Sequence, residues 1–397
     1  MRTSPPKAIA AIAFAIAITS ACSSGSNHNA AKAKPTTPTT PTTPTTTTPV
    51  AYPLDSTLRL NQVQELGSHN SYHAEPYPQI LAKLRQVDPP DAVGLDYGHR
   101  PLPQQFALGV RQIELDVWSD PLGGKYAHPS LPQSLHIPPP DPAVMDKPGF
   151  KVIHVADVDT NSTCLTFVLC LGEVKTWSDA HPGHVPIMID VEMKDTTVTP
   201  ATFDALDAEI RSVLAPSELI TPDDVRGSDP SLGHVIRTRG WPTLGAVRGR
   251  IIFMLDNENF APIELQGHPS LRGRILFASS SPGDDDAAVS KLNNPISDKA
   301  RIKAALAANM LVRTRADADT VQARSNSTTM RDQAFAGGAQ FVSTDYEVPN
   351  LRFSSYVVRI PGGTPARCNP VTAPPGCKPT DVENPKFLTS VPRANGS

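Results

Sequence analysis

The sequence predicts an α/β fold, a (β/α)8 TIM barrel, because apolar runs typical of buried strands alternate with helical stretches along the chain. Amphipathic spacing predicts helices between these runs, as at 202–214 and 297–309, and the crowding of Pro and Gly in 121–150 predicts irregular ones. The eight predicted strands lie within 62–73, 110–118, 150–159, 185–194, 249–257, 274–280, 309–317 and 339–346.

The first 22 residues are predicted to be an export signal. Arg2 and Lys7 precede an apolar stretch of about 14 residues, which is shorter than the ~20 residues that a membrane-spanning helix needs. The stretch ends in ITSAC, which resembles a bacterial lipobox. We therefore expect an exported protein that is either anchored at the cell surface through a lipid on Cys22 or secreted without one.

Composition divides the rest of the chain into three segments. Residues 23–54, which include PTTPTTPTTPTTTTP, carry too little apolar surface for a core and are predicted to form a disordered tether, with or without sugars on its threonines. Residues 55–360 are expected to form the catalytic barrel, since roughly 300 residues suffice for one large domain. The Pro-rich segment 361–397 is expected to lie outside the barrel as an appendix.

The cysteines agree with export. Apart from Cys22 they form two close pairs, Cys164 with Cys170 and Cys368 with Cys377. An even number in an exported chain predicts two local disulfides, with free thiols as the alternative.

A formal net charge of −3 provides no basic surface for nucleic acid. The expected partner is therefore a small or lipidic molecule, and the sequence implies no protein partner.

Oxygen-bearing side chains gather at the ends of the predicted strands. Glu114 and Asp116 stand two residues apart on one strand, so both point to the same face and repel each other unless a cation lies between them. Asn70 and Glu192 end two other strands and add further oxygens. Because all four ligands are oxygens, the set predicts Ca²⁺, or alternatively Mg²⁺, and excludes zinc or copper.

Two histidines occupy comparable strand ends, His69 after the first predicted strand and His154 within the third. Imidazoles beside a metal set are typical of acid/base catalysis, so we predict both as catalytic residues. Eight other histidines lack such positions and are expected at the surface or behind the site: His73, His99, His128, His136, His181, His184, His234 and His268.

Three basic residues are candidates for holding phosphate groups, with an ordinary surface charge as the alternative for each. Lys194 lies two residues beyond Glu192, and Arg313 and Arg315 lie on the seventh predicted strand.

The segments LGSHNSYH, IELDVW and PIMIDVEMK resemble the catalytic barrel of phosphatidylinositol-specific phospholipase C, in particular its bacterial calcium-dependent branch. The resemblance covers roughly residues 60–346. In the eukaryotic enzymes two histidines stand one residue apart in the third segment, whereas here His154 is followed by Asp157 and Asp159.

The resemblance implies that His69 and His154 are catalytic. It also implies that calcium is bound by Asn70, Glu114, Asp116 and Glu192.

The implied reaction cleaves the glycerol–phosphate bond of phosphatidylinositol at a membrane surface. The inositol 2-hydroxyl attacks phosphorus after a histidine or Glu114 removes its proton, and the other histidine protonates the departing glycerol oxygen. We predict His154 as this acid and His69 as a donor to the phosphoryl oxygens. Two alternatives remain: a glycerophosphodiester phosphodiesterase that acts on deacylated diesters, and a surface lipoprotein that binds a ligand without turnover.

Overall fold

The computed structural model describes residues 52–394. The predicted signal segment, its lipidation site Cys22 and the tether up to residue 51 lie outside the described residues. Tyr52, which the sequence placed in the tether, is only 4% exposed and packs edge-on against Phe387. None of the helices within 52–394 is long and apolar enough to cross a membrane.

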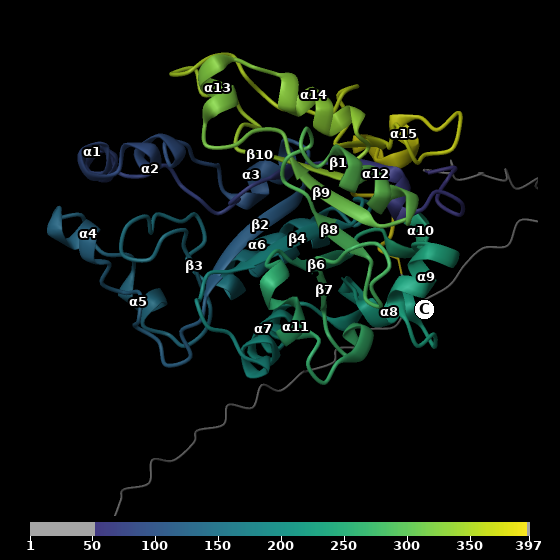
Figure 1. Cartoon of the computed structure of the whole chain (residues 1–397), viewed down its shortest axis with the longest axis horizontal. Coiled ribbons are helices and arrows are strands. Elements are labelled where there is room, and N and C mark those ends of the chain that lie inside the picture. The colour runs from purple at the N-terminus through teal and green to yellow at the C-terminus, as the bar shows by residue number, and fades with distance from the viewer. Residues whose placement is uncertain (1–51, 395–397) are drawn as a thin grey trace, which may run out of the picture. The chain divides into compact units, whose positions relative to one another are not determined.

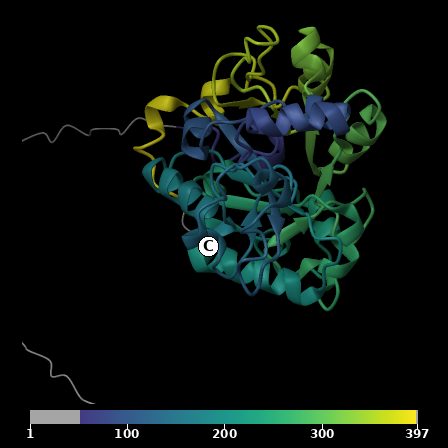
Figure 2. The ribbon, with the colours of Figure 1, turned by 90° about the vertical axis from the view of Figure 1, so that its left-hand side faces the viewer.

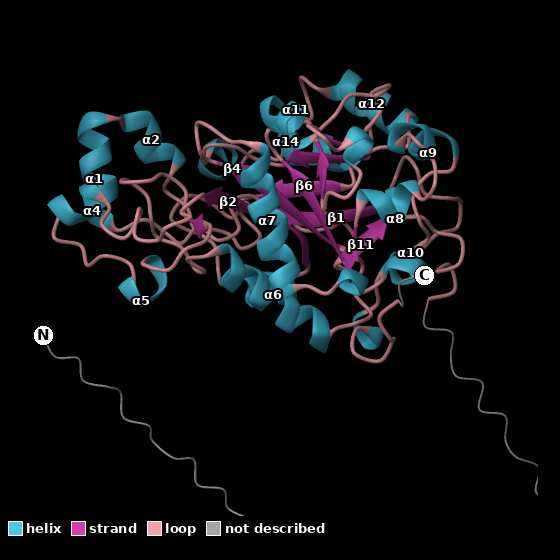
Figure 3. Ribbon diagram, turned by 90° about the horizontal axis from the view of Figure 1, so that it is seen from below, coloured by secondary structure: helices cyan, strands magenta, loops and turns pink. Residues whose placement is uncertain are grey.

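Parallel strands form the centre of the structure and helices surround them (Figures 1 and 3). The strands are β1 (Val63–Ser68), β2 (Val110–Trp118), β3 (Lys151–Val152), β4 (Ile187–Met193), β5 (Leu219–Ile220), β6 (Ile251–Leu255), β7 (Leu276–Ala278), β8 (Val289–Lys291), β9 (Leu311–Arg315), β10 (Phe341–Thr344) and β11 (Ala366–Cys368). The helices are α1 (Pro78–Val87), α2 (Pro89–Gly94), α3 (Leu102–Ala107), α4 (Ser130–Ser134), α5 (Pro142–Met145), α6 (Phe167–Ala180), α7 (Pro200–Val213), α8 (Pro222–Arg226), α9 (Leu232–Thr238), α10 (Leu244–Val247), α11 (Ala261–Glu264), α12 (Lys299–Ala307), α13 (Val321–Ser325), α14 (Thr329–Ala336) and α15 (Pro379–Val382).

The sheet has the connectivity of a parallel barrel. Its strands pair in the order β7-β6-β4-β2-β1-β10-β9-β8, each parallel to its neighbour. The two end strands meet at an isolated parallel bridge between Ser279 and Val289. The predicted α/β barrel is therefore confirmed, and α7 and α12 form where amphipathic spacing predicted helices.

The prediction of a barrel strand within 150–159 is wrong. Segment 150–159 contributes only β3, which pairs antiparallel with the end of β2 through Val117 and Val152. An alternating apolar pattern indicates an extended chain but fixes neither its direction nor its partner. The eighth barrel strand is instead β8, which contains the polar residues Ser290 and Lys291 and so lacks the apolar run that marked the other strands.

The inside of the barrel is polar at β2 and its outside is apolar. Ile113 and Leu115 are fully buried in the hydrophobic core, whereas the alternate residues Gln112 and Glu114 reach partners on β9 and β10 across the barrel. Gly67 on β1 allows this packing, because a Cβ at that position would lie 1.8 Å from Oε1 of Gln112.

The C-terminal segment, the predicted appendix, lies outside the strand order of the barrel but is firmly attached to it. β11 pairs antiparallel with β1. Glu383 is completely buried and accepts hydrogen bonds from Nη2 of Arg111 at 2.6 Å and from the backbone N–H of Val185 at 2.8 Å. The buried Arg111–Glu383 ion pair ties the tail to β2, a link between residues 272 positions apart that sequence spacing cannot indicate.

Both predicted disulfides are confirmed. Cys164 joins Cys170 at the start of α6, and Cys368 joins Cys377 in the C-terminal segment. Disulfides are typical of proteins that fold outside the cytoplasm.

Candidate active site

The carboxyl ends of β1, β2 and β4 meet at one end of the barrel, and most of the predicted site residues lie on these strands or directly after them. Helices α1, α2, α4 and α5 lie beyond this end in two perpendicular views (Figures 1 and 3). Figure 2 shows the same end facing the viewer. Loops at the carboxyl ends of parallel strands are the usual place for a barrel active site.

The structure brings together three of the four predicted metal ligands from two strands. Glu114, Asp116 and Glu192 each offer a carboxylate oxygen, and these atoms lie within 4.8 Å of one another. The β2–β4 register causes this, because it pairs Glu114 with Asp190 and Asp116 with Glu192. Side chains two residues apart on both strands thus face the same interior.

Asn70, the fourth predicted ligand, lies immediately beside this group. The next residue, Ser71, exchanges hydrogen bonds with the backbone of Glu114 at 2.8 and 2.9 Å. Asn70 has a left-handed backbone with φ of 46°, and its Nδ2 donates to the hydroxyl of Tyr97 at 3.0 Å. Its Oδ1 is buried and has no hydrogen-bond partner within residues 52–394.

These four residues fit a hard cation. Oδ1 of Asn70 and Oδ1 of Asp116 are buried acceptors without a hydrogen-bond donor in the described part of the chain. A buried acceptor without a donor is costly, and a bound metal ion removes that cost. Carboxylate and amide oxygens are the ligands that Ca²⁺ prefers.

Burial makes the carboxylates hard to ionise. It raises the pKa of Glu114 to about 8 although the Arg313 guanidinium opposes the shift. Burial and the nearby Glu192 raise the pKa of Asp116 to about 7 although Lys194 opposes that shift. Protons and a metal ion therefore compete for the same oxygens.

The three predicted phosphate-binding residues have different surroundings. Lys194 ion-pairs with Asp116 and Glu192 in the metal set. Arg313 is 1% exposed and ion-pairs with Glu114, so in this structure its charge neutralises a carboxylate of the metal set. Arg315 reaches the mouth and contacts His69.

His69 sits directly after β1, between a carboxylate and a guanidinium. Its Nδ1 lies 2.8 Å from Oδ1 of Asp345, and its Nε2 lies 3.1 Å from Nη1 of Arg315. The ionised carboxylate only accepts and the guanidinium only donates, so Nδ1 carries the proton and Nε2 carries a lone pair. Burial and Arg315 lower the pKa of His69 well below its usual value. This neutral imidazole is suited to accept a proton, which differs from the predicted role of a donor to phosphoryl oxygens.

The backbone of His69 is held by a second histidine. Nε2 of His99 donates to the His69 carbonyl at 2.8 Å, and its Nδ1 donates to Glu347 at 3.0 Å. Burial alone would lower the pKa of His99, but Glu347 outweighs it and raises the pKa to about 9. Both nitrogens therefore carry protons at neutral pH, as the two acceptors require.

His154 follows β3 and is brought to the same end of the barrel when β3 pairs with the end of β2. Its Nδ1 lies 3.2 Å from Oδ2 of Asp159, and Nε2 of His73 lies 2.6 Å from the same oxygen. Burial would raise the pKa of Asp159, but His73 and His154 together hold it well below its usual value. The ionised carboxylate accepts a hydrogen bond from each ring and so orients both.

Several residues that position the site side chains could not be recognised from the sequence. Asp345 lies 276 positions from its partner His69, and Tyr97 lies 27 positions from Asn70, so no local pattern links them. His73 was expected at the surface or behind the site and is 0% exposed behind His154. Its spacing of four residues from His69 was the one available signal.

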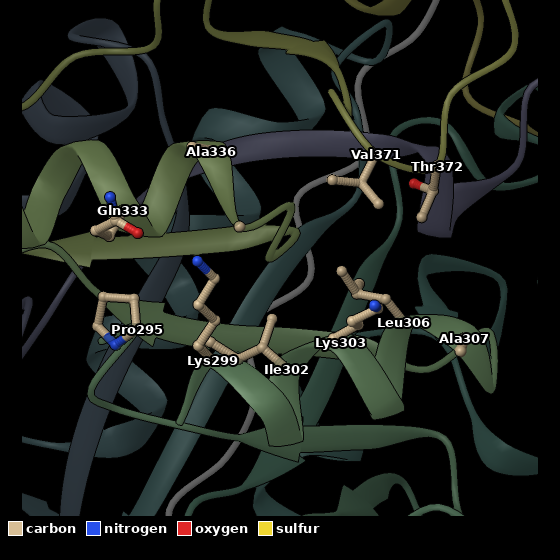
Figure 4. Close-up of a pocket in the computed structure, with 11 residues that line it drawn as sticks. Pro295, Lys299, Ile302, Lys303, Leu306, Ala307, Gln333, Ala336, Val371 and Thr372 are labelled. Carbon is tan, nitrogen blue, oxygen red and sulfur yellow. The ribbon is translucent and has the colours of Figure 1, made fainter. Parts of the chain in front are cut away.

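The cavity shown in Figure 4 lies elsewhere. It has a volume of about 520 Å³ and opens between α12, α14 and the C-terminal segment, where Ile302, Leu306 and Val371 line it together with Lys299 and Lys303. None of the predicted site residues lines it.

Comparisons with known proteins agree with the fold. Residues 58–370 match the model of the family described as phosphoinositide phospholipase C, Ca²⁺-dependent. No curated protein matches the chain.

Solved structures of similar fold come from bacteria. The calcium-dependent phosphoinositol-specific phospholipase C from the Gram-negative bacterium Pseudomonas sp. is 18% identical in its apo form, with a TM-score of 0.51 over 80% of this chain and 97% of that one. Its structure with myoinositol is 19% identical, also with a TM-score of 0.51 over the same shares. The calcium-dependent enzyme from Streptomyces antibioticus is 19% identical, with a TM-score of 0.47 over 72% of this chain and 95% of that one.

The family match spans most of the barrel, including all four predicted metal ligands, both predicted catalytic histidines and the strands that hold them. The chain belongs to the calcium-dependent phosphoinositide phospholipase C family and is a phosphodiesterase of that type.

Proposed function

We propose that this protein is an exported phospholipase C that cleaves the glycerol–phosphate bond of phosphatidylinositol, releasing diacylglycerol and an inositol phosphate. The observation that carries the proposal is the combination of an oxygen-only metal set with two histidines, each hydrogen-bonded to its own carboxylate, at one end of the barrel. A nearby base, a nearby acid and a cation are what internal phosphoryl transfer requires.

The reaction begins at the inositol 2-hydroxyl, which lies next to the phosphodiester. Nε2 of His69 removes its proton while Asp345 stabilises the resulting imidazolium from the other side of the ring. The alkoxide attacks phosphorus and the bond from phosphorus to the glycerol oxygen breaks. Because nucleophile and phosphorus belong to one molecule, the attack has a large effective molarity.

His154 donates a proton to the departing glycerol oxygen. Its hydrogen bond to Asp159 orients the ring for this transfer. Arg315, 3.0 Å from Asp345 and 3.1 Å from His69, is the basic residue best located to contact a phosphoryl oxygen. Bound by Asn70, Glu114, Asp116 and Glu192, calcium supplies the positive charge that lowers the pKa of the hydroxyl and offsets charge on phosphorus.

The loops around the proposed site support action at a lipid surface. Leu122, which follows β2, is 90% exposed, and Leu351, which follows β10, is 79% exposed. An exposed apolar side chain that enters the acyl layer of a membrane leaves water, which favours binding there. Export agrees with the two disulfides, and a lipid on Cys22 would hold the enzyme at the surface where it acts.

Product analysis distinguishes this proposal from the alternatives. We expect the purified chain with calcium to release diacylglycerol from phosphatidylinositol vesicles and to leave phosphatidylcholine vesicles intact. Release of glycerol 3-phosphate from glycerophosphoinositol, with intact lipid untouched, would support the glycerophosphodiester phosphodiesterase. Absence of product from every substrate, with phosphatidylinositol still bound, would support the binding lipoprotein.

A further inference from the structure

Lys194 occupies a position that its predicted phosphate-binding role does not explain. It follows β4, and its backbone N–H donates to the carbonyl of Val117 at 2.9 Å, which extends the β2–β4 ladder by one residue. Its Nζ lies 3.1 Å from Oδ2 of Asp116 and 3.2 Å from Oε1 of Glu192. The lysine charge therefore lies against two carboxylates of the metal set.

The ammonium group offsets a strong repulsion. Asp116 is fully buried and Glu192 is half-buried beside it, so two negative charges in this location are costly without a cation. The ammonium group of Lys194 contacts both carboxylates and places a positive charge between them.

A metal ion and this ammonium cannot share the two carboxylates. Calcium binds oxygens at ~2.3–2.6 Å, so it would lie within a few ångströms of a second positive charge at the present position of Nζ. Repulsion between two cations at such a distance is strong even where the surrounding protein and water screen it. The flexible four-carbon stem of lysine allows Nζ to leave, and the side chain is 21% exposed.

We propose that Lys194 is a built-in counter-ion of the metal set, which calcium has to displace in order to bind. The proposal rests on the metal site of the proposed function and adds to it a residue that weakens calcium affinity. When calcium displaces Lys194, its ammonium group becomes free to contact the phosphate of the substrate. Calcium then occupies the carboxylates while the lysine binds the lipid. The lysine also holds the carboxylates in place at low calcium.

The test measures calcium binding without substrate. Lys194→Met removes the charge at nearly constant side-chain length, and Lys194→Gln removes the charge but keeps a hydrogen-bond donor. Isothermal titration calorimetry should give both variants a calcium Kd about tenfold or more below that of the wild type. In chelator, both variants should melt at a lower temperature than the wild type. Adding calcium should raise their melting temperatures by more than it raises that of the wild type.

Lys125→Met is the matched control, because Lys125 is 56% exposed and pairs with Asp195 at 3.6 Å, outside the metal set. It should bind calcium as the wild type does. Equal or weaker calcium binding by the Lys194 variants would overturn the proposal. Absence of calcium binding in every protein would overturn it together with the metal site, whereas tight calcium binding without lipid cleavage would count only against the proposed reaction.

Discussion

Replacing either histidine of the proposed catalytic pair should lower kcat by ~10²–10⁴, the usual contribution of a general acid or base, with little change in melting temperature. His69→Ala removes the proposed proton acceptor, which Asp345 orients, and His154→Ala removes the proposed donor, which Asp159 orients. Both rings are partly exposed, at 17% and 18%, and lie outside the hydrophobic core. Initial rates of diacylglycerol release and thermal unfolding curves measure the two quantities.

A substrate with a better leaving group separates the two roles. When p-nitrophenol replaces diacylglycerol, the departing oxygen needs no proton, so the His154 variant should recover most of its activity and the His69 variant should not. His128→Ala, at an exposed position outside the site, is the control and should keep wild-type rates. If the His69 variant is rescued instead, His69 is the acid and His154 the base. If both variants cleave the natural lipid at wild-type rates, the proposed active site is wrong.

The second large effect is expected at the metal set. Asp116→Asn keeps the size of the side chain but removes the charge of a completely buried member of the proposed metal set. Calcium affinity should fall by at least the ~10–100-fold typical of residues that merely support a metal ligand, and turnover at low calcium should fall with it. Calcium titrations by calorimetry and by activity give the two numbers.

Asp190→Asn is the matched control for this variant. Asp190 also lies on β4 inside the barrel, but it is paired in register with Glu114 and does not belong to the group of three carboxylates. Its calcium affinity should stay close to that of the wild type. Unchanged calcium affinity in the Asp116 variant would remove that residue from the metal set.

Local pattern predicted the parts of the site that a single strand determines. The two-residue spacing of Glu114 and Asp116 places both on the inner face of β2, and the structure shows them there. The end of β1 likewise marked His69 and Asn70. Period-two alternation and strand ends are local properties, so they can be recognised without knowledge of the fold.

Contacts between distant segments could not be predicted in this way. Segment 150–159 has the apolar pattern of a barrel strand, yet only its pairing with β2 determines that it runs antiparallel. Arg313 appeared to be a candidate for phosphate, yet its partner Glu114 lies 199 positions away and inside the barrel. The attachment of the tail through Glu383 depends equally on a long-range ion pair. Such contacts depend on the register of the sheet.

The central claim is that this chain cleaves phosphatidylinositol by internal attack with calcium in the metal set. Phosphorus NMR of phosphatidylinositol vesicles with the purified chain tests it most directly. With calcium, the diester signal should give way to that of an inositol cyclic phosphate, followed or not by its hydrolysis, while diacylglycerol accumulates. In excess chelator the diester signal should persist. Equal turnover with and without chelator, or no turnover in either, would contradict the account.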